Sequence, residues 1–290
     1  TMTLGCSRKI AILILAQVVG ACRVFDTGKV RLVALWLAVV ALPWQVAYGW
    51  GQEGHKLIAR VAVAHMKPKT LAALGGLLNQ GETIESVVSW ADRVRPQRPE
   101  TATWHYINIP ITESKDWHKY CPETDCVVSI IGKLEDRLAD RSLPREQRRE
   151  ALLFLMHCIA DLHQPVHAGD LRDRGGNEVP TVYRNYAGNL HSLWDTGLIL
   201  GYEKTDPDLE KRLIRHASAW EFWRTRRGKA SDWVWQSHAI SRDVAYPNLP
   251  QGRPAQIGEE YARAAEPYVE RQLRRAGLRM AATLNHILGR

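Results

Sequence analysis

The stretch LLFLMHCIADLHQPVH, residues 152–167, decides the fold, because it predicts a buried helix that carries polar side chains. His157 and Asp161 are four residues apart, about one helical turn, so an imidazole and a carboxylate project from the same face. A Gln-Pro dipeptide follows, and proline ends the helix before His167. Histidine nitrogen and carboxylate oxygen both bind zinc. The stretch therefore predicts a helix that presents metal ligands.

A second stretch, NLHSLWDTGLI at residues 189–199, repeats the spacing with His191 and Asp195. A single His-x-x-x-Asp pair on a helix is more often a hydrogen-bonded pair than a metal site. Here two such pairs occur in one chain, and His167 lies between them. This combination favours more than one metal ion.

Further histidine and aspartate candidates lie upstream in equally apolar settings. They are His55, Asp92 in SVVSWADRVR and His105 in TWHYINIP. Each alone is explained as a hydrogen-bonded core group. Together with the five residues above they make eight buried acids and imidazoles, and a helical core does not need so many unless cations neutralise them.

The apolar pattern has a helical period through nearly all of the chain after residue 50. Strand signals are confined to short pieces such as Thr181–Tyr183, at most a hairpin. In 290 residues no repeat divides the chain, so we expect one all-α domain. The predicted helices cover residues 55–66, 70–79, 84–94, 127–141, 145–162, 189–200, 206–228, 230–241 and 254–288.

Residues 1–49 differ from the rest because they contain two apolar runs, Ile10–Val19 and Leu32–Leu42. Neither run reaches the roughly 20 residues that a membrane span needs. The second run ends in Ala-Tyr-Gly, with small residues at the two positions that a signal peptidase recognises. We therefore expect residues 1–49 to be a presequence that is cleaved before Trp50, which leaves a domain over residues 50–290. An uncleaved N-terminal anchor is the alternative.

Two apolar runs in tandem are unusual for a signal peptide. They are explained if translation starts at Val30, read from an alternative start codon, because the following residues then form a signal of ordinary length. Mass spectrometry of the precursor tests this hypothesis, and detection of residues 1–29 would exclude it.

The charge and the cysteines of residues 50–290 bear on the class of substrate and on the redox compartment of the protein. After residue 49 the chain carries 34 basic and 30 acidic side chains, a balance of +4 that favours a polyanionic substrate without establishing one. Cys121 and Cys126 close the short polar loop CPETDC, and a disulfide between them fits an oxidising compartment. Zinc ligation by this pair is the weaker alternative, because no second cysteine pair accompanies it. Cys158, in the apolar helix, is expected to be a buried free thiol.

Taken together, the motifs of residues 50–290 resemble the zinc-dependent nucleases and 3'-nucleotidases of the S-one/P-one type, which share a fold with bacterial zinc phospholipases C. Both the order and the spacing of the motifs match. The resemblance implies a helical protein that holds three zinc ions at the bottom of a cleft. The motifs are WGQEGH, SWAD, WHYINIP, HCIADLHQPVH, GGN, NLHSLWD and the closing ERQLRRAGLRMAATLN.

The resemblance also implies how the ligands divide among the ions. The three sets are Asp92, His105, His157 and Asp161 for the first ion; Trp50, His55 and Asp161 for the second; and His167, His191 and Asp195 for the third. Trp50 would contribute its free α-amine and its carbonyl. An amide nitrogen inside a chain has no lone pair to give, so removal of the presequence would complete the site.

Catalytic roles follow from the same resemblance. Two close ions that share Asp161 would lower the pKa of a bridging water, and Asp92 would orient it. Arg95 would approach the phosphate, although a solvated surface arginine is an equal alternative. Tyr106 would stack on a nucleobase, with a structural role in the core as the alternative. Asn108 stands where fungal members have an aspartate that reads the base edge, so their base preference does not carry over.

The sequence thus predicts a secreted or periplasmic zinc phosphodiesterase that hydrolyses RNA and single-stranded DNA to 5'-phosphate products and also acts on 3'-nucleotides. Neither a stable membrane association after cleavage nor a protein partner is expected. One alternative is a phospholipase C, which would need an apolar groove for acyl chains. Another is an envelope zinc-binding protein without catalysis, against which Arg95 argues. His163 is excluded from the ligands because, two residues from Asp161, it points about 160° away on a helix.

Overall fold

Helix α8 (Arg145–Leu162) forms the centre of the fold, and every residue from Ala151 to Leu162 is buried. A helix that is apolar on all sides needs neighbours on all sides. Helix α7 (Val127–Ala139) packs against it, and so do α3 (Gln52–Val63) and α14 (Glu259–Leu288). The helix predicted over residues 145–162 is therefore confirmed.

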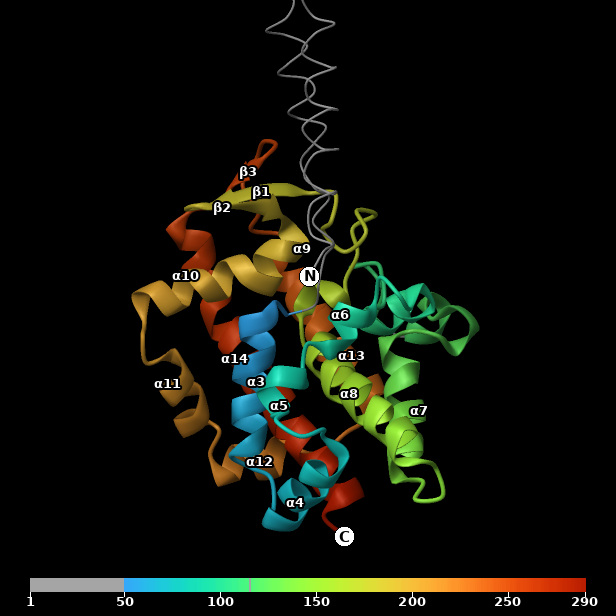
Figure 1. Cartoon of the computed structure of the whole chain (residues 1–290). Coiled ribbons are helices and arrows are strands. Elements are labelled where there is room, and N and C mark those ends of the chain that lie inside the picture. The colour runs from blue at the N-terminus through green and yellow to red at the C-terminus, as the bar shows by residue number, and fades with distance from the viewer. Residues whose placement is uncertain (1–49, 115) are drawn as a thin grey trace, which may run out of the picture. The chain divides into compact units, whose positions relative to one another are not determined.

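The computed structural model describes residues 50–114 and 116–290, and the all-α class is confirmed for this part of the chain (Figure 1). The predicted presequence over residues 1–49 and the hypothesis of a start at Val30 lie outside the described residues. No helix within the described ranges combines the length and the apolar character that crossing a membrane requires.

Helices α3 and α14 lie side by side along the domain (Figure 1). A glycine permits their close approach, because a Cβ at Gly277 would lie 2.6 Å from the Cβ of Val61 and 2.9 Å from the carbonyl oxygen of Ile58. The first turn of α3 carries the buried His55, and the other end of the helix lies near α12 (Ala219–Thr225), as Figure 1 shows.

The remaining helices cover this central group. Helix α4 starts with a proline, which suits the first turn of a helix. The bounds are α4 (Pro68–Leu77), α5 (Ile84–Val87), α6 (Trp90–Val94), α9 (Leu190–Ser192), α10 (Leu198–Thr205), α11 (Leu209–His216), α12 (Ala219–Thr225) and α13 (Ala230–Ile240). Short 3₁₀ and π segments join them: η1 (Pro99–His105), η2 (Trp117–Tyr120), η3 (Pro122–Thr124), η4 (Pro165–His167), η5 (Leu193–Gly197) and η6 (Ser241–Ala245).

Two segments that were predicted to be single helices each form two helices, so these two predictions are wrong. The helix expected over residues 84–94 is divided between α5 and α6, and there the carbonyl of Val88 turns to bond Nδ1 of His157. The helix expected over residues 206–228 is divided because the Ser218 side chain accepts a hydrogen bond from the N–H of Glu221 and starts α12 anew.

Two further expectations need correction. The helix expected over residues 254–288 begins only at Glu259, because Ala255–Gln256 form strand β3 instead. The expected hairpin is part of a three-stranded sheet in the order β2-β1-β3, in which β1 (Pro180–Tyr183) pairs antiparallel with β2 (Tyr186–Asn189) and parallel with β3. Pairing between distant segments is not visible in a local pattern.

Candidate metal centre

Four side chains from three separate elements converge and form the first group of the centre. His157 and Asp161 come from one face of α8, Asp92 from α6 and His105 from the end of η1. Nε2 of His157 lies 3.1 Å from Oδ2 of Asp161 and 3.3 Å from Oδ1 of Asp92. Nδ1 of His105 lies 2.9 Å from Oδ2 of Asp161 and 3.1 Å from Nε2 of His157. Ligand atoms about 2 Å from a tetrahedral zinc ion are separated by about 3.3 Å, so this set fits one ion.

The carboxylate of Asp161 also faces a second group. Its Oδ1 lies 3.3 Å from Nε2 of His55, whereas Oδ2 faces His105 and His157. The ring of His55 stacks on that of His157 with centroids 4.3 Å apart. The carboxylate of Asp161 thus lies between the imidazoles of His105 and His157 on one side and that of His55 on the other, an arrangement that suits a ligand shared by two neighbouring ions.

His167, His191 and Asp195 form the third group. Their ligand atoms are close: Nε2 of His191 is 3.0 Å from Nε2 of His167, and the two nitrogens lie 3.7 Å and 3.6 Å from the Asp195 oxygens. His167 ends η4, His191 is in α9, and Asp195 lies in the π turn η5. All three are buried, and π turns inside helices often occur at functional sites.

Backbone carbonyls hold three of these histidines in one tautomer. A carbonyl oxygen only accepts a hydrogen bond, so each Nδ1 carries a proton, and each of these imidazoles, when neutral, presents the lone pair of Nε2 to the group. Such hydrogen bonds are typical of histidines that ligate metals. The pairs are His157 with Val88 at 2.9 Å, His167 with His105 at 2.6 Å and His191 with Gly175 at 2.7 Å.

One carboxylate oxygen in each aspartate of the centre is buried without a hydrogen bond in the described part of the chain. These atoms are Oδ1 of Asp92, Oδ1 of Asp161 and Oδ2 of Asp195. Leaving a buried acceptor unsatisfied costs about 1–3 kcal/mol. Cations at the groups would satisfy all three, so the residues present fit bound metal ions.

The two most buried aspartates differ in their electrostatics. Burial opposes ionisation of Asp161, but the charge of His157 and hydrogen bonds from the surrounding histidines outweigh burial and hold its pKa well below the ordinary value. Burial raises the pKa of Asp195 well above the ordinary value, because His191 and Gln164 compensate it only in part. A cation at the third group would favour the ionised form of this carboxylate.

Trp50, the first described residue, is fully buried two residues before α3. The N–H of Gly51 donates to the carbonyl of Asp195 at 2.8 Å, and a Cβ at Gly51 would lie 2.1 Å from Oγ1 of Thr196. The N–H of His55 in turn bonds the carbonyl of Gly51. The beginning of the domain is thus held against the third group and leads within one turn to the second.

The segment after His105 is extended and runs beside the segment after His167. The N–H of Ile107 bonds the carbonyl of His167 at 2.8 Å. Alternate residues are buried, which leaves the half-buried Tyr106 and Asn108 on the opposite side. Asn108 approaches the third group, since a Cβ at Gly175 would lie 3.6 Å from its Oδ1 and 3.5 Å from Nδ1 of His191. Both predicted substrate contacts therefore lie on one side of this strand-like segment.

Arg95 caps the C-terminus of α6, the helix that carries Asp92. Its backbone N–H bonds the carbonyls of Ala91 and Asp92, and its side chain is half-buried. The backbone link keeps it within one turn of the first group. Its contact with phosphate stays a prediction.

Sequence reasoning missed Gln164, which it used only as part of a helix stop. Its Nε2 donates to Oδ1 of Asp195, and its Oε1 accepts from the N–H of Val166 at 2.6 Å. Gln164 thus orients the carboxylate of the third group from the loop that carries His167. Its position inside the motif HQPVH was the available signal.

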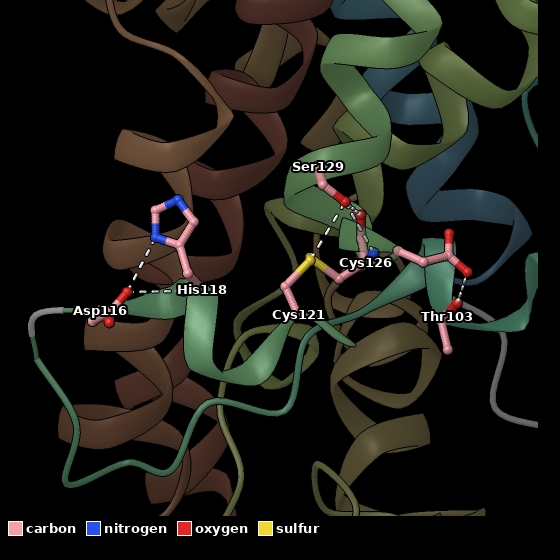
Figure 2. The surroundings of a disulfide bond; sticks show 7 residues. Thr103, Asp116, His118, Cys121, Cys126 and Ser129 are labelled. Atoms are coloured by element: carbon pink, nitrogen blue, oxygen red, sulfur yellow. Dashed lines mark hydrogen bonds and ion pairs between the residues drawn. A yellow bond between two sulfur atoms is a disulfide. The ribbon is translucent and has the colours of Figure 1, made fainter. Parts of the chain in front are cut away.

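The disulfide between Cys121 and Cys126 is confirmed. Its loop contacts η1, the segment that ends at His105. Figure 2 shows Ser129 next to both cysteines, and its Oγ accepts a hydrogen bond from the N–H of Cys126 at 3.1 Å. Thr103 in η1 donates to Asp125 in the loop at 3.0 Å. The disulfide loop is therefore bonded to the segment that ends at His105.

Two other expectations from the sequence agree with the described structure. Cys158 is a buried free thiol. His163 lies outside the three groups, because its Nδ1 bonds the carbonyl of Ile159 and its Nε2 accepts from Arg279 at 2.7 Å.

Comparisons with known proteins show similarity in sequence to nucleases over most of the chain. The model of the S1/P1 nuclease family matches residues 50–289. Endonuclease 5 of Arabidopsis thaliana is 30% identical over 288 residues, which cover 87% of this chain and 96% of the relative. Nuclease P1 of Penicillium citrinum is 29% identical, with 83% and 98% of the two chains covered. Nuclease S1 of Aspergillus oryzae is 27% identical, with 89% and 98% covered.

Proposed function

The chain belongs to the S1/P1, or S-one/P-one, nuclease family, and on that premise we propose that it hydrolyses RNA and single-stranded DNA to 5'-phosphate products and removes phosphate from 3'-nucleotides with the same site. The observation that carries the proposal is the position of Asp161 between His105 and His157 on one side and His55 on the other, with a third His/Asp group close by. Phosphoryl chemistry needs positive charge on both sides of the reacting phosphorus.

The ligand sets in this proposal are those that the resemblance implies. Zinc ions held by the three groups would supply Lewis acidity and a water of lowered pKa. The protein's own part is to fix the ligands by burial and by the backbone bonds to their Nδ1 atoms. Asp92, whose Oδ1 lies 3.3 Å from Nε2 of His157, would also orient the attacking water.

Substrate contacts are assigned to the residues that border the centre. Tyr106 offers a ring for stacking and Asn108 an amide that can both donate and accept on a base edge. Arg95 would pair with the phosphate as charge develops on it. Unpaired strands suit this arrangement, because their bases are free to leave the stack.

The second ion in this proposal requires the α-amine of Trp50, and thus removal of residues 1–49. In this proposal the mature chain is either secreted or periplasmic, and in both places the disulfide between Cys121 and Cys126 persists. Cleavage before Trp50 would both export the protein and complete its metal centre.

One experiment tests the reaction. The purified mature chain is incubated with RNA, single-stranded DNA, duplex DNA, 3'-AMP and phosphatidylcholine, each with and without a chelator. We expect chelator-sensitive release of 5'-mononucleotides from RNA and single-stranded DNA, slower release from duplex DNA and phosphate release from 3'-AMP. Release of phosphocholine alone would indicate the phospholipase C alternative, and no turnover in stoichiometrically metal-loaded protein would indicate a non-catalytic zinc-binding protein.

A further inference from the structure

Helix α12 exposes its largest apolar side chains instead of burying them. Trp220 is 66% exposed and Trp223 43% exposed. On the other side of the same helix Phe222 packs against the core, and its ring stacks on His65 with centroids 5.7 Å apart. Burying an indole is strongly favourable, so two exposed indoles on one helix need another explanation than folding.

The two indoles form an ordered stack. Three residues apart, they lie on the same helix face, with ring centroids 5.3 Å apart and planes within 18° of parallel. The guanidinium of Arg227 lies over the Trp223 ring, 4.3 Å from its centroid. Such a stack of flat groups suits another flat group better than it suits an acyl chain.

The same surface is strongly cationic. Arg224, Arg226 and Arg227 are exposed, and none of the three is within ion-pair distance of a carboxylate in the ranges that the structure describes. Lys229 is exposed too, but its charge acts on Glu135. The acid of this helix, Glu221, is 3.4 Å from Arg274 of α14.

The neighbouring part of α14 adds to this positive charge. Burial and then the charges of Arg271 and Arg224 lower the pKa of Arg275 to about 10. The cationic groups are thus crowded enough to repel one another. A polyanion would relieve this repulsion.

We propose that this surface binds single-stranded nucleic acid outside the metal centre. We call it the tryptophan platform and define it as Trp220, Trp223, Arg224, Arg226 and Arg227. A base stacks on the outer face of Trp220 and extends the indole stack, while the cationic side chains pair with the neighbouring phosphates. The proposal rests on the proposed function for the class of ligand, but the binding itself requires no turnover.

The platform lies at the far end of α3 from the metal centre. His55, at the second group, and His65, which stacks on Phe222 of α12, are ten residues apart on α3 and its continuation. At 1.5 Å per residue the separation along the helix axis is about 15 Å. A strand of many nucleotides reaches both places, whereas a mononucleotide in the metal centre reaches only one. The platform therefore raises affinity for long strands and leaves hydrolysis of 3'-nucleotides unaffected.

Binding is measured first, without turnover. A fluorescein-labelled 20-nucleotide oligothymidylate is titrated with the purified mature chain in the presence of EDTA, and its anisotropy is followed. The double variant Trp220→Ala/Trp223→Ala is expected to raise Kd about fivefold or more, because loss of one stacked base costs about a factor of five or more. Trp220→Phe/Trp223→Phe keeps flat rings and is expected to stay within about threefold of the unmodified chain.

The cationic part is tested by salt dependence. Arg226→Ala/Arg227→Ala is expected to reduce the slope of log K against log salt by about 1.4, which corresponds to two phosphate contacts on a single strand. The matched control is Arg242→Ala, which removes an exposed cation from η6 and is expected to leave Kd and slope unchanged.

Kinetics with the metal-loaded enzyme complete the test. For the alanine double variant we expect a higher KM on the 20-nucleotide strand, an unchanged kcat, and unchanged constants on 3'-AMP. An unchanged Kd and KM would overturn the proposal. The proposal would also be overturned if the alanine double variant lost binding to phosphatidylglycerol vesicles but kept its binding to the oligonucleotide. That result would identify a membrane-binding surface. Tryptophan-dependent binding by a chain that hydrolyses none of the substrates would refute the proposed function and leave the platform standing.

Discussion

Nε2 of His55 lies 3.3 Å from Oδ1 of Asp161, the carboxylate oxygen that faces away from the first group. This contact divides the two oxygens of one carboxylate between two ligand sets. A chain that needed Asp161 only as a partner of His157 would not have to bury a third imidazole beside it.

Asp161→Ala is therefore expected to remove more than one equivalent of zinc and to reduce hydrolysis of single-stranded DNA at least about 10³-fold. The comparison variant is Asp195→Ala, which serves only the third group and is expected to lose about one equivalent. Elemental analysis of the purified proteins measures both. Equal metal losses in the two variants would contradict the shared role of Asp161.

A free amine at Trp50 is expected to be required for the full metal complement. A chain that begins at Trp50 is compared with one that retains Gly49 as its first residue, which moves the amine out of reach and leaves every side chain in place. The extended chain is expected to bind one zinc fewer and to lose most of its activity. Identical metal content in the two proteins would refute ligation by the amine.

Asp195→Asn is expected to have opposite effects on stability with and without metal. Because the folded-state pKa of Asp195 is raised, the folded state binds a proton more tightly than the unfolded state, and its stability falls as pH rises through the unfolded pKa toward the folded one. In chelator at neutral pH, the neutral amide removes this penalty and is expected to raise Tm by a few degrees. With zinc present the same variant loses a ligand and is expected to have a lower Tm.

Asp161→Asn is the contrasting variant in this experiment. The folded-state pKa of Asp161 is lowered, so its carboxylate contributes stability above the unfolded pKa, and that stability is lost as pH falls through the folded pKa. Loss of the charge should lower Tm with and without zinc. Scanning calorimetry of both variants measures the difference, and a Tm of Asp195→Asn below that of the unmodified chain in chelator would contradict the argument.

Gln164→Ala is expected to weaken zinc binding by the third group about 10- to 100-fold, as removal of groups that orient a ligand typically does. Gln272→Ala is the matched control, since Gln272 is also buried but bonds the carbonyl of His163 and Oγ of Ser237 instead. Competition with a chromogenic chelator measures the weakest site. Equal effects of the two substitutions would mean that Gln164 acts only on stability.

The double variant Cys121→Ser/Cys126→Ser is expected to destabilise the fold by about 2 kcal/mol, because the disulfide closes a loop of only a few residues. Since that loop is bonded to η1 through Thr103 and Asp125, hydrogen exchange should increase in η1. Exchange that increases only within the loop would show that the disulfide does not support His105.

Much of this protein follows from sequence alone, because the relevant patterns are local. The i, i+4 spacing of His157 and Asp161 on an apolar helix was enough to predict that both face one point, and all eight imidazole and carboxylate residues predicted to be buried together do lie in the three groups. Helical periodicity also predicted most of the helices. Those predictions need only the 3.6-residue repeat and the chemistry of each side chain.

Other features depended on contacts between distant segments, and only the tertiary structure decided them. Helix α5 ends just before Val88, whose carbonyl accepts a hydrogen bond from Nδ1 of His157, 69 residues later in the chain. Gln164 gained its role from Asp195, and Ala255–Gln256 form a strand because Thr181 and Val182 lie beside them. The exposure of Trp220 and Trp223 is of the same kind, since a sequence does not state which aromatic rings the core leaves outside. A local pattern determines which way a side chain points, but only the packed fold determines what it meets.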